Sequence, residues 1–243
     1  MPAASKTRAS VSLNPLSQPS DQSATSLMLQ WASLRNVAPL RSTVDRKRWI
    51  AVTSRSCEHC PQRGPVAMIA YKTSKNAKIL FVGINPHPGS YRRGVPFSNN
   101  KMFWYLLNRS GLIAEADSDL KDDRSLKRIY ERKFLTKYSL NFLNLVDRAT
   151  VDVTQLKSGE KRAGAKKVLK IIQACKPKVI CFIGKIAFNT FYSSRKCEWG
   201  WHAGINSSKV YLMHFPIRGP AEIRIRELRE VKEASEDQVI RLE

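Results

Sequence analysis

Two side chains in the segment 78–112 suit the capture of a flat, polar ring. Asn85 lies in the turn Gly-Ile-Asn-Pro at residues 83–86, directly after the apolar run of residues 79–82. A buried strand that ends in this way holds an amide side chain at the carboxyl edge of a sheet, where open α/β sheets bind their ligands. Phe97 follows eleven to twelve positions later, ahead of a helix-like stretch. An amide and an aromatic ring brought close together favour a nucleobase as the ligand.

A second amide and a histidine come from later parts of the chain. Asn144 lies near the end of the apolar run 140–146, and its side chain offers the donor and acceptor groups that match the polar edge of uracil or thymine. His214 follows the apolar run 210–213 and opens the sequence His-Phe-Pro-Ile-Arg-Gly-Pro at residues 214–220. This histidine could lie against a base and stabilise its developing charge, or it could be a neutral histidine at a strand end.

The family resemblance drawn below from several motifs implies hydrolysis of an N-glycosidic bond as the reaction of these side chains. The sugar becomes oxocarbenium-like while negative charge collects on the departing base, so a useful site positions water near the sugar and stabilises the anionic base. Asn85 can orient water or donate to the base, but it cannot act as a strong general base. Each residue also has a structural alternative: Asn85 as a turn former, Phe97 as a core side chain, and Asn144 as a tie for the strand end.

The elements that must position these residues alternate between strands and helices. Four apolar runs have the length of strands, at residues 79–84, 140–146, 179–183 and 210–213, and their nearly continuous apolar content indicates burial on both faces. Helical patterns cover residues 101–108, 163–175, 185–192 and 223–231. We therefore predict an α/β fold, a three-layer α/β/α arrangement with a central, mainly parallel four-stranded sheet. We expect Phe103 and Trp104 in its core, and Asp147 and Arg148 as a local ion pair.

The folded domain is predicted to span residues 45–231. Residues 1–44 are rich in Ser, Thr, Pro, Gln and Ala without sustained periodicity, which is typical of a disordered N-terminal arm. Residues 232–243 are predicted to form a C-terminal tail. At 243 residues and 42% hydrophobic content, the chain can bury one sizeable core.

The charge of the chain indicates a polyanionic partner. It carries 42 Lys and Arg against 20 Asp and Glu, a formal net charge of +22, which predicts attraction to nucleic acid. A merely soluble basic surface is the alternative. No long apolar stretch or clean basic amphipathic helix favours a membrane. The five cysteines form no regular framework, and the pair Cys57 and Cys60 lacks the second half of a metal site, so we expect neither a metal nor another cofactor.

Several motifs follow one another between residues 78 and 231. They are Gly-Ile-Asn-Pro at 83–86, Gly-Val-Pro-Phe at 94–97, Phe-Trp at 103–104, Asn-Leu-Val-Asp-Arg-Ala-Thr at 144–150, Ile-Gly-Lys at 183–185 and Trp-Gly at 199–200. Each motif alone is weak evidence for a family, but their joint order and spacing are hard to explain by chance. In this respect the chain resembles the mismatch-specific uracil/thymine-DNA glycosylases of the uracil-DNA glycosylase superfamily.

The resemblance implies a role for each base-binding residue. In that family the residue matching Asn85 positions the attacking water, and the aromatic residue matching Phe97 forms the platform under the extruded base. An amide at the place of Asn144 contacts the base. Gly83 and Ile84 would complete the base-binding pocket.

The resemblance also assigns the loop 214–220 to the segment that enters the duplex and fills the gap left by the flipped base. Pro216, Arg218 and Gly219 would form this wedge, and His214 would be the second catalytic residue, as a histidine is in the uracil enzymes of the superfamily. The loop departs from the usual Asn-Pro-Ser-Gly and Met-Pro-Ser-Ser patterns. Lys-Met at 101–102 stands where the family has Asn-Arg, and His87 replaces the Gly that usually follows Asn-Pro.

The sequence as a whole predicts a monofunctional DNA glycosylase that removes uracil, mismatched thymine or a modified pyrimidine from double-stranded DNA in base excision repair. We expect a monomer that works in the nucleus, with a mitochondrial location left open. Two alternatives remain. One is a broader uracil-DNA glycosylase that also acts on single strands, and the other is a non-catalytic DNA-binding module of the same fold.

Overall fold

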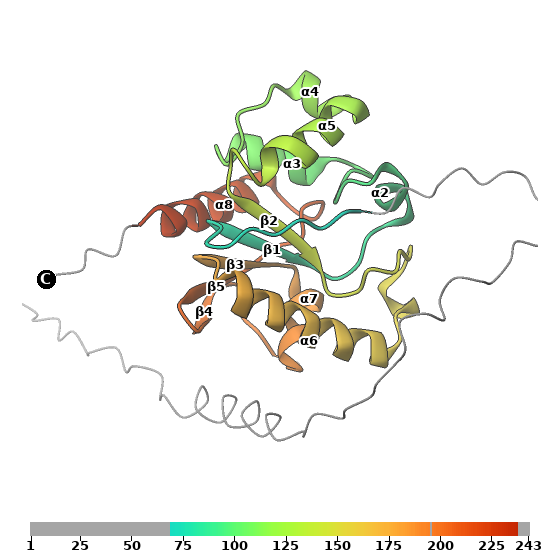
Figure 1. The fold of residues 1–243 in the computed structure, drawn as a ribbon, viewed down its shortest axis with the longest axis vertical. Helices are drawn as coiled ribbons and strands as arrows, with labels where there is room; N and C mark the ends of the chain where they lie inside the picture. The colour runs from blue at the N-terminus through green and yellow to red at the C-terminus, as the bar shows by residue number, and fades with distance from the viewer. Residues whose placement is uncertain (1–68, 195, 238–243) are drawn as a thin grey trace, which may run out of the picture. The chain divides into compact units, whose positions relative to one another are not determined.

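A five-stranded sheet forms the middle layer of the computed structural model, which describes residues 69–194 and 196–237 (Figure 1). The strand order is β2-β1-β3-β5-β4, with bounds β1 Ile79–Gly83, β2 Leu140–Asn144, β3 Val179–Ile183, β4 Gly200–Ile205 and β5 Ser208–Met213. Four strands run parallel, and β4 lies antiparallel to β5 at one edge. The predicted α/β fold class is confirmed, with five strands in place of the expected four.

The parallel strands end together, which is what a shared binding edge requires. All residues of β1, β2 and β3 are buried, as their continuous apolar runs predict. Gly83 pairs with Asn144, and Ile183 pairs with Met213, so the last residues of four strands lie side by side. The loops that follow them therefore meet at the carboxyl edge of the sheet.

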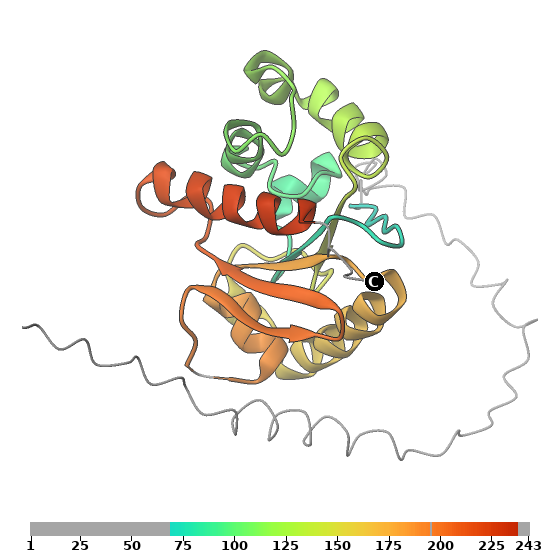
Figure 2. The same cartoon turned by 90° about the vertical axis from the view of Figure 1, so that its left-hand side faces the viewer.

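Helices on one face of the sheet pack against a core that includes Phe81, Phe103 and Trp104 (Figures 1 and 2). The elements of this half are α2 Pro88–Arg93, α3 Met102–Arg109, α4 Asp117–Lys121, α5 Asp123–Ile129, a π-helical turn Tyr130–Phe134, and α8 Ala221–Glu236. Phe103 and Trp104 are fully buried, which confirms their assignment to the core. Burial of two such large aromatic side chains holds α3 firmly against the sheet.

The opposite face of the sheet is covered by α6 Ser158–Cys175 and α7 Lys185–Tyr192, with a short 3₁₀ turn at Val153–Gln155 (Figures 1 and 2). α6 approaches the chain very closely just after β2. A Cβ atom built on Gly164 would lie 2.1 Å from the carbonyl oxygen of Leu145. Only glycine allows the helix to lie at this distance.

The prediction missed β4 and the short helices α2, α4 and α5. The residues of β4 are half-buried or exposed, so this strand does not form an apolar run. The missed helices have five to seven residues, too few for a helical period to emerge. α8 is longer than the predicted 223–231 and includes residues 232–236 of the expected tail. The predicted arm 1–44, Cys57 and Cys60 lie outside the described residues.

Candidate functional site

A pocket of about 690 Å³ opens at the carboxyl edge of the sheet, between the ends of β1, β2, β3 and β5. Six of the predicted site residues line it: Ile84, Asn85, Phe97, Asn144, His214 and Arg218. Gly83 lies directly behind Asn144, while Pro216 and Gly219 are outside the lining. A second cavity of about 750 Å³, beside β4, β5 and α8, contains none of the predicted residues. The structure therefore gathers most of the predicted site around one opening.

Asn85 lines this pocket with its side-chain nitrogen turned to the wall. Nδ2 donates to Thr150 Oγ1 over 2.8 Å and also lies 3.1 Å from the carbonyl oxygen of Pro86. The hydroxyl of Thr150 in turn donates to the carbonyl oxygen of Asp152 over 2.8 Å. Among the described residues, no donor reaches Oδ1 of Asn85. The side chain is thus held as an acceptor, which is the form that can hold and orient a water molecule.

Asn144 is fixed at the back of the pocket by a residue that the sequence analysis did not single out. Its Nδ2 donates to the hydroxyl of Tyr71 over 2.6 Å, and only 3% of the residue is exposed. Burial raises the pKa of Tyr71, so this phenol stays neutral and can accept the bond. A Cβ atom on Gly83 would lie 2.4 Å from Oδ1 of Asn144. Glycine at residue 83 therefore makes room for the amide.

Phe97 joins a cluster of aromatic rings at the side of the pocket. Its ring centroid lies 4.9 Å from that of Phe103, 5.6 Å from Phe142 and 5.8 Å from Phe215. The backbone of Phe97 is left-handed, with φ of 53°. A non-glycine residue is held in that conformation only when its surroundings fix it. Phe97 is thus both packed against the core and part of the pocket lining, and its two predicted roles are compatible.

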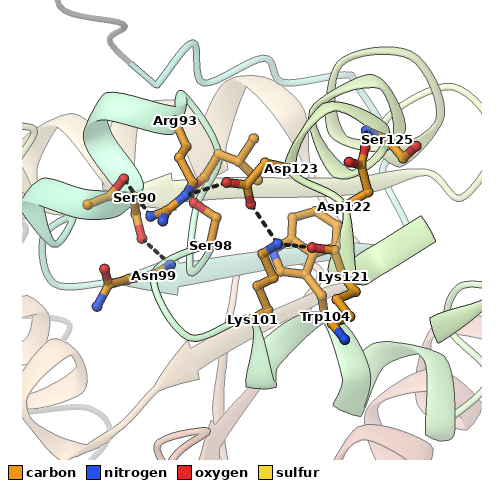
Figure 3. Close-up of polar contacts among 12 residues, drawn as sticks. Ser90, Arg93, Ser98, Asn99, Lys101, Trp104, Lys121, Asp122, Asp123 and Ser125 are labelled. Atoms are coloured by element: carbon orange, nitrogen blue, oxygen red, sulfur yellow. Dashed lines mark hydrogen bonds and ion pairs between the residues drawn. The ribbon is translucent and has the colours of Figure 1, made fainter. Parts of the chain in front are cut away.

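A polar network fixes the loop that carries Phe97 (Figure 3). Asp123 at the start of α5 accepts from Arg93 Nε over 2.9 Å and pairs with Lys101 Nζ at 2.6 Å. These contacts hold the pKa of the Asp123 carboxyl below its usual value, with Lys101 as the larger cause. Inside the loop, Ser90 Oγ accepts from the backbone nitrogen of Asn99 over 3.0 Å. Arg93 and Lys101 thus tie the two ends of the Phe97 loop to Asp123 of α5. Lys101 does so at a place where the glycosylases that the sequence resembles have Asn.

The comparison with known families agrees with this geometry. A family model described as the uracil DNA glycosylase superfamily matches residues 70–231, a range that includes every strand of the sheet and the first two thirds of α8. The chain belongs to the uracil-DNA glycosylase superfamily. This membership suggests a uracil-type DNA glycosylase activity and implies DNA binding. Among the described helices, none combines the length and apolar character of a membrane span.

His214 of this superfamily member lies at the end of β5 between an aromatic ring and a carboxylate. Its ring stacks on Trp199, with centroids 3.8 Å apart and planes 22° from parallel. Lys185 Nζ lies 4.8 Å from the centroid of the Trp199 ring. On the other side, Nδ1 of His214 lies 2.5 Å from Oε1 of Glu227 on α8. From the sequence, Trp199 was recognised only as part of the Trp-Gly motif at 199–200. Glu227 was missed, because a single Glu in a helix cannot be recognised as a histidine partner from one sequence.

The predicted wedge loop of this glycosylase-superfamily chain is anchored by Arg224 of α8. Its guanidinium donates to the carbonyl oxygens of Arg218 and Gly219, and Gly219 has φ of 76°. Pro216 is buried, whereas Arg218 and Gly219 are exposed. The exposed apolar side chain of the loop is Ile217, at 52%. The wedge roles of Pro216, Arg218 and Gly219 stay predictions, and Ile217 is the apolar residue best placed to share them.

The mouth of the pocket collects exposed apolar side chains. The large hydrophobic side chains exposed on the described part of the chain are Val151, Ile186, Trp199, Trp201 and Ile217, and all except Trp201 line this pocket. Exposed apolar residues gathered around one opening mark a binding surface. We call Val151, Ile186, Trp199 and Ile217 the apolar rim.

The expected ion pair between Asp147 and Arg148 is wrong. Asp147 pairs with Lys167 at 2.8 Å, and Arg148 pairs with Glu160 at 2.7 Å. Both partners lie on α6, which packs beside this segment, and adjacent residues point in different directions. The two pairs attach residues 147 and 148 to α6 and so steady the segment that leads to Thr150, the partner of Asn85.

Proposed function

We propose that the protein is a monofunctional DNA glycosylase that hydrolyses the N-glycosidic bond of uracil, mismatched thymine or a modified pyrimidine in duplex DNA, as a step of base excision repair in the nucleus. The observation that carries this proposal is the meeting of Asn85, Asn144 and Phe97 around one pocket at the carboxyl edge of the sheet. Superfamily membership supports the reaction class.

Base recognition would use the amide of Asn144 and the ring of Phe97. The edge that uracil and thymine share offers an acceptor oxygen beside a donor N–H, and one carboxamide can satisfy both. Because Tyr71 holds this amide in place, little conformational freedom is lost when the base enters. Stacking on Phe97 would add about 1–3 kcal/mol. The pocket, at about 690 Å³, is large enough that volume alone admits the 5-methyl group of thymine.

Hydrolysis would use Asn85 to place the attacking water. The oxygen of the water bonds to C1′ of the sugar as the bond from C1′ to the base nitrogen breaks, and the electron pair of that bond leaves with the base. One water proton is released to solvent, and the anionic base is stabilised by donors in the pocket. An acceptor such as Oδ1 of Asn85 orients the water but does not remove its proton, which suits a reaction whose sugar is already cationic. The products are a free base and an abasic site.

Duplex specificity would come from the apolar rim. Extrusion of a base leaves a gap in the stack, and proteins that distort DNA fill such gaps with apolar side chains. Ile217 lies in the predicted wedge loop and is the most exposed apolar side chain of that loop. The high positive charge of the chain would supply the attraction to phosphates, so binding should weaken steeply with salt.

The test is base release from labelled duplexes that carry uracil or thymine opposite guanine. Asn85→Ala should lower the rate of release at least about 100-fold, because both the orientation of water and the wall of the pocket are lost. Asn206→Gly removes an exposed amide from the turn between β4 and β5, where φ is 54°, and serves as the matched control with wild-type activity. A wild-type rate in Asn85→Ala would refute the mechanism.

The same assay separates the alternative functions. Equal release from matched single strands would favour the broader uracil-DNA glycosylase. Binding of duplex without any release would favour the non-catalytic module. Strand breaks should form only after alkali treatment, because a monofunctional enzyme leaves the sugar–phosphate backbone intact. A covalent product trapped by borohydride would instead indicate Schiff-base chemistry, with Lys185 as the lysine in the pocket lining.

A further inference from the structure

The carboxylate of Glu227 engages His214 twice. Oε2 accepts from the backbone nitrogen of His214 over 3.0 Å, and Oε1 lies 2.5 Å from Nδ1 of the ring. Glu227 is only 5% exposed and comes from the second turn of α8. A carboxylate buried to this degree must be satisfied by hydrogen bonds and a nearby positive charge. Both of its oxygens serve the residue at the edge of the proposed base pocket.

His214 is the partner that the structure offers to both oxygens of this carboxylate. Within the described residues, no Lys or Arg nitrogen lies within ion-pair distance of Glu227. Arg224, one turn earlier on α8, directs its guanidinium to the loop carbonyls of residues 218 and 219. On the pocket side, Lys185 lies over the ring of Trp199, and Arg218 is exposed in the loop.

Two further titratable groups, Cys181 and Tyr211, lie near Glu227 and His214. Burial, and then the charge of Glu227, raise the pKa of the Cys181 thiol on β3. Burial is also the main cause that raises the pKa of Tyr211 on β5, whose hydroxyl bonds to Glu230 over 3.0 Å. Neither group carries charge near neutral pH, so neither competes with His214 for the carboxylate.

An ionised carboxylate accepts hydrogen bonds and donates none. The ring nitrogen that faces it therefore carries a proton in both the neutral and the charged histidine. The other nitrogen, Nε2, has no partner among the described residues, and His214 lines the pocket. With Nδ1 already protonated, Nε2 holds a proton only when the ring is the imidazolium.

We propose that Glu227 is a positioning residue that fixes the proton of His214 on Nδ1, so that His214 can donate from Nε2 to the departing base only as the imidazolium. The assignment of the base as ligand rests on the proposed function, but the proton position does not. Trp199 supports the arrangement because its ring, stacked at 3.8 Å, sets the plane of the imidazole. This differs from a neutral histidine donor, which would carry its proton on Nε2.

The first test is the proton position in the free protein, read from the ¹⁵N signals of the imidazole rings. The signals of His214 are identified by their loss in His214→Gln. At alkaline pH, where the ring is neutral, wild type should show the proton on Nδ1 and a bare Nε2. In Glu227→Ala the proton should move to Nε2 in most molecules. Glu230→Gln, one turn further along α8, is the matched control and should leave the His214 signals unchanged.

The second test is the pH profile of uracil release. Wild-type release should fall as the pH rises, because the pocket-facing proton is lost. Glu227→Gln should release uracil about tenfold more slowly near neutral pH, because the carboxylate no longer positions the ring. Its release should fall much less as the pH rises, because the neutral ring can then carry its proton on Nε2 and still donate to the base. Folding of each variant is checked by its thermal melting curve.

Two results would overturn the proposal. One is a neutral His214 in wild type with its proton on Nε2, which would mean that Glu227 donates to the ring. The other is an unchanged pH profile in a folded Glu227→Gln variant. If the proton lies on Nδ1 but the protein releases no base, the proposed function fails while the tautomer assignment stands.

Discussion

The floor and the rim of the pocket are built in opposite ways. On the floor, Asn85 and Asn144 are polar side chains whose nitrogens are already committed to Thr150 and Tyr71. On the rim, Ile217 and Trp199 are apolar side chains, 52% and 40% exposed. Polar groups held in advance suit chemistry, because nothing needs to reorganise during the reaction. Exposed apolar groups gain from burial only when a partner arrives. The difference separates the part that would perform the reaction from the part that would grip DNA.

Removal of an amide from the floor should have the largest effect. Asn144→Ala should lower uracil release from duplex about 100-fold or more, because the base edge loses its donor and acceptor while Tyr71 is left with an unpaired buried hydroxyl. Binding to duplex without a lesion should be unchanged, since the floor is reached only by a flipped base. Single-turnover release and fluorescence anisotropy measure the two quantities. A parallel loss of both would place Asn144 outside base recognition.

Truncation of the rim should have an intermediate and substrate-dependent effect. Ile217→Ala should slow release from duplex about tenfold, because the gap left by the flipped base is filled less well. Release from a matched single strand should be unaffected, since no stack has to be repaired. The ratio of the two rates is the measurement. Equal losses on both substrates would show that Ile217 shapes the pocket and has no wedge role.

The smallest effect concerns the support of the floor. The side chain of Arg148, followed by the backbone nitrogen of Lys157, holds the pKa of the half-buried Glu160 carboxyl down at about 2. A pKa depressed in the folded state stabilises the protein above the ordinary range of Glu, and this stabilisation is lost as the pH falls toward about 2. Glu160→Gln should therefore lower Tm at pH 7 by at most about 2 °C, because exposed pairs contribute little.

Thermal melting curves of Glu160→Gln and wild type, measured at several pH values, test this prediction. The difference between Glu160→Gln and wild type should shrink as the solution is acidified. Glu222→Gln, an exposed change in the first turn of α8 without an ion pair among the described residues, is the control and should show no such trend. A difference that persists in acid would mean that the side chain of Glu160 acts by packing.

The sequence was enough to place the floor of the pocket but not its supports. Asn85 follows one apolar run and Asn144 lies near the end of another, and parallel strands must end at one edge, so their meeting could be predicted. Tyr71 and Glu227 could not be found in this way. Their contacts join residues 73 and 13 positions apart, and they depend on how the chain before β1 and α8 lie against the sheet. The wrong prediction of an ion pair between Asp147 and Arg148 has the same origin. Their true partners, Lys167 and Glu160, lie on α6, and the sequence does not show how α6 packs against this segment.

The strand β4 and the short helices were missed for a different reason. No residue of β4 is fully buried, so its side chains need not be apolar, and helices of five to seven residues show barely more than one turn. Packing of larger elements decides such segments, and a single sequence carries little record of it.

The missing side chain of Gly164 couples α6, on the far face of the sheet, to the proposed site. The α-carbon of Gly164 rests on the carbonyl of Leu145, the residue that follows Asn144. A methyl group there would push on the peptide next to Asn144, from a helix that contributes no residue to the lining of the pocket. Substitutions of Gly164 would therefore be expected to disturb the pocket in the same way as substitutions in its lining. Mutagenesis limited to the residues that line the pocket would not find them.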